Sequence, residues 1–192
     1  MGFLDQLFSR KKNKDDDDEP LNLAHEENME ITFIKNFKAG NGMFFYCEDK
    51  QEALEQLKQI FVNEDITEVL CVDGKLISFI NVLDCYHSSE KNKHQDIAFI
   101  TCEYLIVLDG SVMISSDQTH HLKKSDLPEK IIIWAHPDQI ISTSSVGLAK
   151  IRFNKQDNIP ANITALHGNQ MQGFTDIATA KKLYLLLVEE KL

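Results

Sequence analysis

The sequence lacks clustered cysteines, long apolar runs and an excess of positive charge. Its four cysteines, Cys47, Cys71, Cys85 and Cys102, form no Cys-x-x-Cys pair. Neither an iron–sulfur cluster nor a structural zinc site is therefore expected, and we expect no metal and no cofactor. Buried free thiols of a reducing compartment are the simpler interpretation, which predicts a cytoplasmic protein. Because apolar settings raise thiol pKa values and no Gly-x-Ser-x-Gly motif is present, nucleophilic catalysis has little support.

The charge balance and the short apolar runs exclude further classes of protein. No run approaches the about 18 consecutive apolar residues of a transmembrane segment, and the N-terminus lacks the order of a signal peptide. The formal net charge is −10, which disfavours nucleic acid as a partner. The 192 residues suit one domain with a tail, and an apolar content of 43% is sufficient for a hydrophobic core.

Residues 1–25 are predicted to be a flexible tail. Phe3, Leu4, Leu7 and Phe8 have helical spacing, four basic residues follow within 10–14, and a run of acids occupies 15–19. Two interpretations stay open for this amphipathic and charged segment. It is a frayed terminus without a role, or it docks on a protein partner or, weakly, on an anionic membrane surface through residues 3–14.

Residues 26–192 are predicted to form a single α/β domain with a mainly parallel sheet flanked by helices. Helices are expected over about 28–39, 51–62 and 75–83, the last with a strand as the alternative, and a further helix is expected to begin at Pro137. Asp49 and Glu52 match a capping box for the second helix, which should bury Leu54, Leu57, Ile60 and Phe61. Strands are expected at 43–47, 68–72, 96–100, 104–108, 111–115, 130–134, 149–153, 162–166 and 183–188.

The stretch EYLIVLDGSVMISS, residues 103–116, predicts a hairpin whose turn is Asp109-Gly110. The turn is either purely structural or the floor of a binding site. The preceding run YLIVL is apolar at every position, as in a strand buried on both faces. Turns that follow such strands often line the crevice where open α/β sheets bind ligands, and Ser111 adds a hydroxyl there.

A second candidate segment is HGNQMQGFTDIATAKK, residues 167–182. His167 follows an apolar strand, where it could act as a base or bind a substrate anion. Gly168 would let backbone amides approach an anion, and Thr175 and Asp176 precede a possible helix N-terminus. Plain helix capping by Thr175 and Asp176 is an equal alternative. His120 and His121 are expected to be solvated loop residues.

These segments together resemble the LUD (lactate-utilisation) domain family. The resemblance rests on EYLIVLDGSVMISS, SDLPEKIIIWAHPDQII, the glycine-bearing loop with Thr-Asp-Ile and LYLLLVEE, and it extends to FIKNFKAGNGMFFYCEDKQEALEQL. It covers roughly residues 28–190. Two departures stand out: Leu108 and Asp109 replace the family's acidic residue and threonine, and the Gly-Pro-Ser core of the second loop is missing.

The resemblance implies a NagB/RpiA/CoA-transferase-like fold and a link to a bacterial system that oxidises L-lactate to pyruvate. In that system iron–sulfur subunits carry the redox centres, so this chain would be a non-redox accessory protein or would bind a small carboxylate or phosphorylated metabolite. The implied ligand-binding residues are Asp109, Gly110, Ser111, Gly168 and Thr175, and the candidate catalytic residues are His167 and Asp176. The alternatives are a catalytically empty module that docks through its N-terminal peptide, or a divergent enzyme of the CoA-transferase superfamily.

Overall fold

A six-stranded sheet forms the centre of the protein. The computed structural model describes residues 21–92, 94–156, 158–168 and 181–192, with the backbone alone for 21–28. All the strands of this sheet run parallel, as the sequence predicts. Their spatial order is β1 (Met43–Cys47), β10 (Lys182–Val188), β7 (Lys130–Ala135), β4 (Ile97–Thr101), β2 (Glu68–Leu70) and β3 (Tyr86–Ser88).

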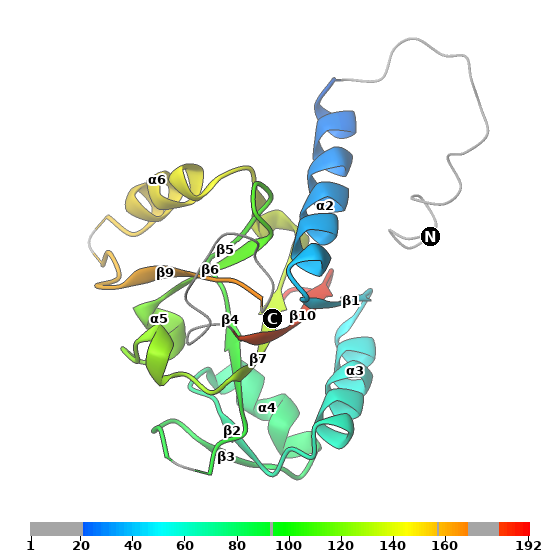
Figure 1. Ribbon diagram of the computed structural model, residues 1–192, viewed down its shortest axis with the longest axis vertical. Helices are drawn as coiled ribbons and strands as arrows, with labels where there is room; N and C mark the ends of the chain where they lie inside the picture. The colour runs from blue at the N-terminus through cyan, green and yellow to red at the C-terminus, as the bar shows by residue number, and fades with distance from the viewer. Residues whose placement is uncertain (1–20, 93, 157, 169–180) are drawn as a thin grey trace, which may run out of the picture.

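The central strands are buried on both faces because helices or further strands cover each side of the sheet. In β7, Ile131 and Ile133 face one core while Ile132 and Trp134 face the other. The second core is closed by α3 (Lys50–Asn63) and α4 (Gly74–Val82), both at predicted positions. Both helices are in the lower half of Figure 1.

The start of α3 follows the predicted cap with one change. The Asp49 carboxylate accepts a hydrogen bond from the Glu52 amide at 2.9 Å. The Glu52 side chain accepts from the amide of Glu48, not from that of Asp49, so the reciprocal half of the capping box is shifted by one residue. Leu57 is buried as expected, but Leu54 is only half-buried.

The first core is closed by α2 (Leu21–Ala39) and by a second, four-stranded sheet that the sequence does not predict. Its order is β8 (Ile140–Ile141), β5 (Tyr104–Ile106), β6 (Ser111–Ser115) and β9 (Ile163–Leu166). The hairpin β5–β6 is antiparallel, as predicted. Helix α6 (Ser144–Asn154) packs on the outer face of this smaller sheet (Figure 1).

The sequence prediction is wrong between Pro137 and Phe153. Pro137 opens one turn of 3₁₀ helix, η2 (Pro137–Gln139), and β8 follows it. The predicted strand 149–153 is the last part of α6, whose N-cap Thr143 accepts from the amide of Val146. The burial shows why: Ile151 faces the core, whereas Phe153 is 75% exposed, so the apolar residues do not share the face that a strand would give them.

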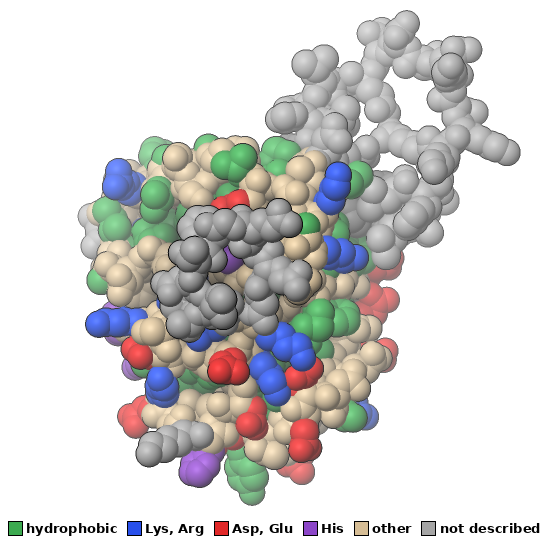
Figure 2. Space-filling view, viewed as in Figure 1, with side chains coloured by type: hydrophobic (Ala, Val, Ile, Leu, Met, Phe, Trp, Pro, Cys, Tyr) green, Lys and Arg blue, Asp and Glu red, His purple; other side chains and the backbone are tan. Residues whose placement is uncertain are grey.

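Helix α2 starts at Leu21, earlier than the sequence predicts, and ends before Gly40 as expected. Phe33 and Phe37 fill the core between the two sheets, and their rings stack. None of the described helices is long and apolar enough to cross a membrane. On the face shown in Figure 2, acidic and basic side chains are interspersed.

Candidate functional site

The Asp109-Gly110 turn connects β5 to β6 and packs against the C-terminal end of α2. The Gly110 amide donates to the carbonyl of Ile106 at 2.9 Å, and Gly110 has φ of +67°. A Cβ at Gly110 would overlap the backbone of Phe37 and lie 2.8 Å from the carbonyl oxygen of Asn36. The Asn36 side chain in turn donates to the carbonyl of Val107 at 2.8 Å. Glycine is therefore required here by the close approach of the helix.

Gly168 also lies against backbone atoms at the C-terminal end of α2. A Cβ at this position would overlap the carbonyl oxygen of Gly40 and lie 2.9 Å from its carbon. The end of α2 thus contacts both loops that the sequence singles out. Because protein backbone occupies the space beside Gly110 and Gly168, packing alone accounts for both glycines, and their role toward a ligand stays a prediction.

Asp109 organises the turn through its carboxylate. Oδ1 of Asp109 accepts from the Ser111 amide at 3.0 Å and from the Ser111 hydroxyl at 2.6 Å. Ser111 is completely buried. The amide and the hydroxyl of Ser111 both donate to Asp109, so neither is free to bind an anion. This arrangement differs from the role that the sequence had suggested for Ser111.

The histidine predicted at the end of β9 lies next to this carboxylate. The antiparallel pairing of β6 with β9 sets Val112 opposite Leu166, so the chain continues into His167 beside the turn. Nε2 of His167 is 3.5 Å from Oδ2 of Asp109, and the two side chains are 25% and 31% exposed. The fold therefore brings two predicted site residues together at the surface, from segments far apart in the sequence.

The arrangement differs from that of a nucleophilic serine. The Ser111 hydroxyl donates to the carboxylate and not to an imidazole, so Asp109 stands between serine and histidine. In this serine–aspartate–histidine arrangement, no imidazole contacts the Ser111 hydroxyl to act as its general base. What the pair offers is a hydrogen-bond acceptor that carries negative charge, next to an imidazole that can donate. Thr175 and Asp176, the remaining candidates, lie outside the described residues.

The carboxyl ends of the parallel strands carry a histidine that the sequence analysis missed. His136 follows β7 and, with Pro137 and Lys150, lines a cleft of about 640 Å³ between α2 and α6. Nε2 of His136 is 2.8 Å from the carbonyl of Glu189, and Nδ1 is 2.7 Å from Asp138. Because both ring nitrogens already have protein partners, His136 joins β7 to the end of β10. The sequence feature that could have identified His136 is its position directly after a buried strand.

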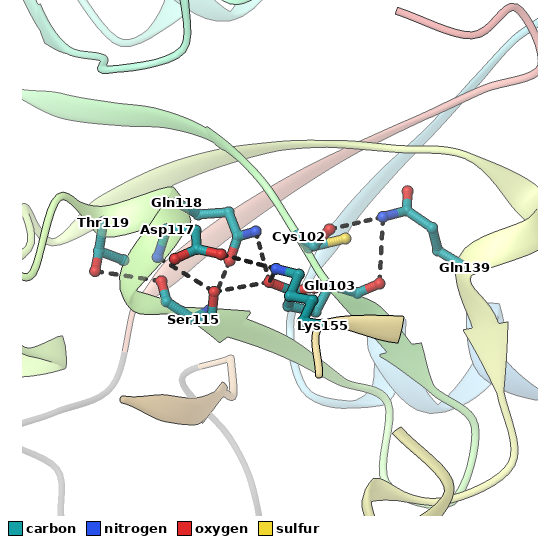
Figure 3. A network of polar contacts seen from close by, with 8 residues as sticks. All are labelled: Cys102, Glu103, Ser115, Asp117, Gln118, Thr119, Gln139 and Lys155. Atoms are coloured by element: carbon teal, nitrogen blue, oxygen red, sulfur yellow. Dashed lines mark hydrogen bonds and ion pairs between the residues drawn. The ribbon is translucent and has the colours of Figure 1, made fainter. Parts of the chain in front are cut away.

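A partly buried ionic cluster lies at the other end of the small sheet (Figure 3). Oε1 of Glu103 accepts from Lys155 at 2.6 Å, from Ser115 at 2.7 Å and from Gln118 at 3.0 Å. Burial acts to raise the pKa of this carboxyl, but the three hydrogen bonds and the charge of Lys155 outweigh it and hold the pKa below its ordinary value. Lys155 also pairs with Asp117 at 2.8 Å. With these partners in place, the cluster fixes α6 and β6 to the β4–β5 junction.

The pKa values of the four thiols are raised, as the sequence predicts. Burial raises the pKa of Cys47 and of Cys71 to about 12, and it also raises the pKa values of Cys85 and Cys102. His120 and His121 are exposed. Among the described residues, no group of three histidine, cysteine or acidic side chains could hold a metal ion.

Comparisons with known proteins agree with this architecture. No family model matches the sequence, and no curated protein matches it either. Among solved structures, the chain is similar to a DUF162 family protein from Deinococcus radiodurans, with a TM-score of 0.65. The match covers 85% of this chain and 98% of that chain at 14% sequence identity. DUF162 is the LUD domain family, and the similarity supports the predicted α/β fold with a mainly parallel sheet flanked by helices.

Proposed function

We propose that this chain is a divergent LUD-domain protein that binds a small 2-hydroxycarboxylate such as lactate, and that it does no redox chemistry itself. The observation that carries the proposal is the surface pair of Asp109 and His167, which come from two different loops and lie 3.5 Å apart. The amide and the hydroxyl of Ser111 each donate a hydrogen bond to Oδ1 of Asp109 and so fix the position of this carboxylate. The pair is therefore pre-positioned, which lowers the cost of binding a ligand.

The chemistry of the pair fits a ligand that has both a donor and an anionic acceptor. The separation of 3.5 Å between Nε2 of His167 and Oδ2 of Asp109 is longer than a good hydrogen bond, so the contact between these two atoms is mainly electrostatic. A hydroxyl group of the ligand would donate to Asp109, and its carboxylate would accept from a ring N–H of His167. A ligand with a carboxylate alone would leave Asp109 facing a like charge.

The non-redox part of the proposal is supported by the cysteines. Their raised pKa values disfavour thiolates, which are the form that binds metals and takes part in disulfide exchange. Electron transfer would then belong to iron–sulfur partners of a lactate-oxidising complex. The purified protein should accordingly be colourless, and a stoichiometric chromophore in native protein would overturn this part.

The experiment is a calorimetric titration of the full chain with lactate, pyruvate and propionate. We expect one site for lactate and roughly tenfold to hundredfold weaker binding of propionate, which lacks the hydroxyl donor to a charged acceptor. Asp109→Asn should abolish the preference for lactate, and His167→Gln should weaken the binding of both lactate and propionate. His87→Gln is the matched control, because His87 is exposed on the edge strand β3. Equal binding of lactate and propionate by the wild-type chain would contradict the proposal.

A further inference from the structure

A groove between the C-terminal ends of α3 and α4 exposes apolar side chains. Its volume is about 700 Å³, and its lining extends to the start of the edge strand β3. Three large apolar residues of this lining are strongly exposed: Val62 at 71%, Val82 at 67% and Tyr86 at 82%. We call this surface the Val62 groove. Exposed apolar side chains that gather in one place indicate a surface that another molecule covers.

The Val62 groove has charges of opposite sign at its two ends. Lys58 lies on α3, and Asp65 and Asp84 follow the ends of α3 and α4. The Cys85 thiol donates to the carbonyl of Thr67 at 3.4 Å, which brings the two turns that carry the acids together. The lysine and both acids are exposed, and within the described residues none of the three forms an ion pair. Their charges are thus available to a partner.

The N-terminal segment, residues 1–14, has an apolar face that suits such a surface. It lies outside the described residues, and its sequence is MGFLDQLFSRKKNK. Its four large apolar residues have the spacing of one helical face: Phe3, Leu4, Leu7 and Phe8. A common mode of peptide recognition lays the apolar face of a short helix into an apolar groove. The segment and the Val62 groove have the two halves of that arrangement.

The charges of the N-terminal segment match those of the groove in spacing and in sign. Asp5 and Lys12 are seven residues apart, as Lys58 and Asp65 are. Seven residues are about two helical turns, so Asp5 and Lys12 would lie on the same side of the predicted helix, ~10 Å apart. With this helix parallel to α3, Asp5 would face Lys58 while Lys12 would face Asp65. Complementary charges of this kind fix the register of a partner.

The tether is too short for the segment to reach the groove of its own chain. The groove is at the amino end of the sheet, because Lys130 at the start of β7 donates to the carbonyl of Glu64 after α3. The C-terminal end of α2 is at this end too, directly before β1. Leu21 is at the far end of α2, about 28 Å away along its 19 residues (Figure 1). The seven peptide units from Lys14 to Leu21 span at most about 25 Å.

We propose that the Val62 groove binds the N-terminal segment of a second copy of this chain. Because each copy has both a segment and a groove, reciprocal exchange closes a two-fold dimer. The contact uses none of the residues proposed to bind a hydroxycarboxylate, so Asp109→Asn should leave it unchanged. A failure of either proposal is therefore distinguishable from a failure of the other.

The first test is sedimentation velocity of the full chain over a range of protein concentrations. We expect a monomer–dimer equilibrium whose dissociation constant rises at least about tenfold in Phe8→Asp and in Val62→Asp. Phe153→Asp is the matched control and should dimerise normally, because Phe153 is equally exposed but lies on α6. A wild-type chain that stays monomeric at all concentrations would overturn the proposal. Dimers that persist in both Phe8→Asp and Val62→Asp would do so too, because they would form through another surface.

The second test separates a specific contact from general stickiness. Phe8→Asp keeps an intact groove and Val62→Asp keeps an intact segment, so a mixture of the two variants should form dimers that neither forms alone. Lys12→Asp and Asp65→Lys should each weaken the dimer, and the chain that carries both should recover it, since the pair is restored with its signs exchanged. If the mixture stayed monomeric or the double variant were weaker than either single variant, the assignment of the segment to the groove would be wrong.

Discussion

Replacing Gly110 by alanine should destabilise the protein strongly, because the residue has two independent reasons to be glycine. Its φ of +67° costs an L-residue about 1–2 kcal/mol. The new Cβ would also meet the backbone of Asn36 and Phe37, and overpacking of this kind costs about 1–3 kcal/mol. The sum is a loss of about 2–5 kcal/mol in the free energy of unfolding, measured by urea denaturation with circular dichroism.

Gly74→Ala is the matched control for this prediction. Gly74 is the first residue of α4, and a Cβ there would meet no atom within 4 Å. Alanine is the better helix former, so this variant should be unchanged or more stable by up to about 1 kcal/mol. If Gly110→Ala proved as stable as Gly74→Ala, the packing of α2 on the turn would be wrong. The large expected loss also means that Gly110 variants report on folding, whereas Asp109→Asn reports on binding.

Three further predictions concern the Glu103 cluster and the cysteines. Lys155→Met leaves Glu103, whose side chain is 10% exposed, without its cation. We expect the free energy of unfolding, measured by urea denaturation, to fall by about 2 kcal/mol. Adding Glu103→Gln to the same chain should largely restore it, and strictly additive effects of the two substitutions would contradict the coupling. Because the pKa of Glu103 is lowered on folding, its stabilisation is present above the ordinary carboxyl pKa and is lost as the pH falls through the folded value. The free energy of unfolding of Glu103→Gln should therefore fall less in acid than that of the wild type, and parallel pH profiles would refute this. Iodoacetamide at pH 8 should label Cys47, Cys71 and Cys102 only after unfolding, and mass spectrometry of native protein that shows their rapid labelling would disprove the buried-thiol assignment.

The sequence predicts the central sheet well because its strands are continuous apolar runs. Runs such as 130–134 and 183–188 have no polar face, which only a strand covered on both sides requires. The stretch 149–153 is short, and its apolar residues Ala149, Ile151 and Phe153 alternate as they would in a strand. Its helical state depends on the Thr143 cap and on packing of Ile151 against the small sheet, which is tertiary information.

The candidate site could be predicted only in part. The hairpin signal at Asp109-Gly110 and the place of His167 after a strand are local, so both could be read from the sequence. Their meeting depends on the pairing of β6 with β9, which no local pattern specifies. The Glu103 cluster was missed for the same reason, because its cation, Lys155, lies far along the chain.

The most direct test of the central claim is an NMR titration of the imidazole of His167 in ¹⁵N-histidine-labelled protein. The account predicts that lactate shifts the His167 resonances saturably, that propionate does so much more weakly, and that Asp109→Asn removes the difference. The resonances of His87 should not move with either ligand. If lactate left His167 unperturbed at concentrations that bind elsewhere on the protein, the hydroxycarboxylate site at Asp109 and His167 would be wrong.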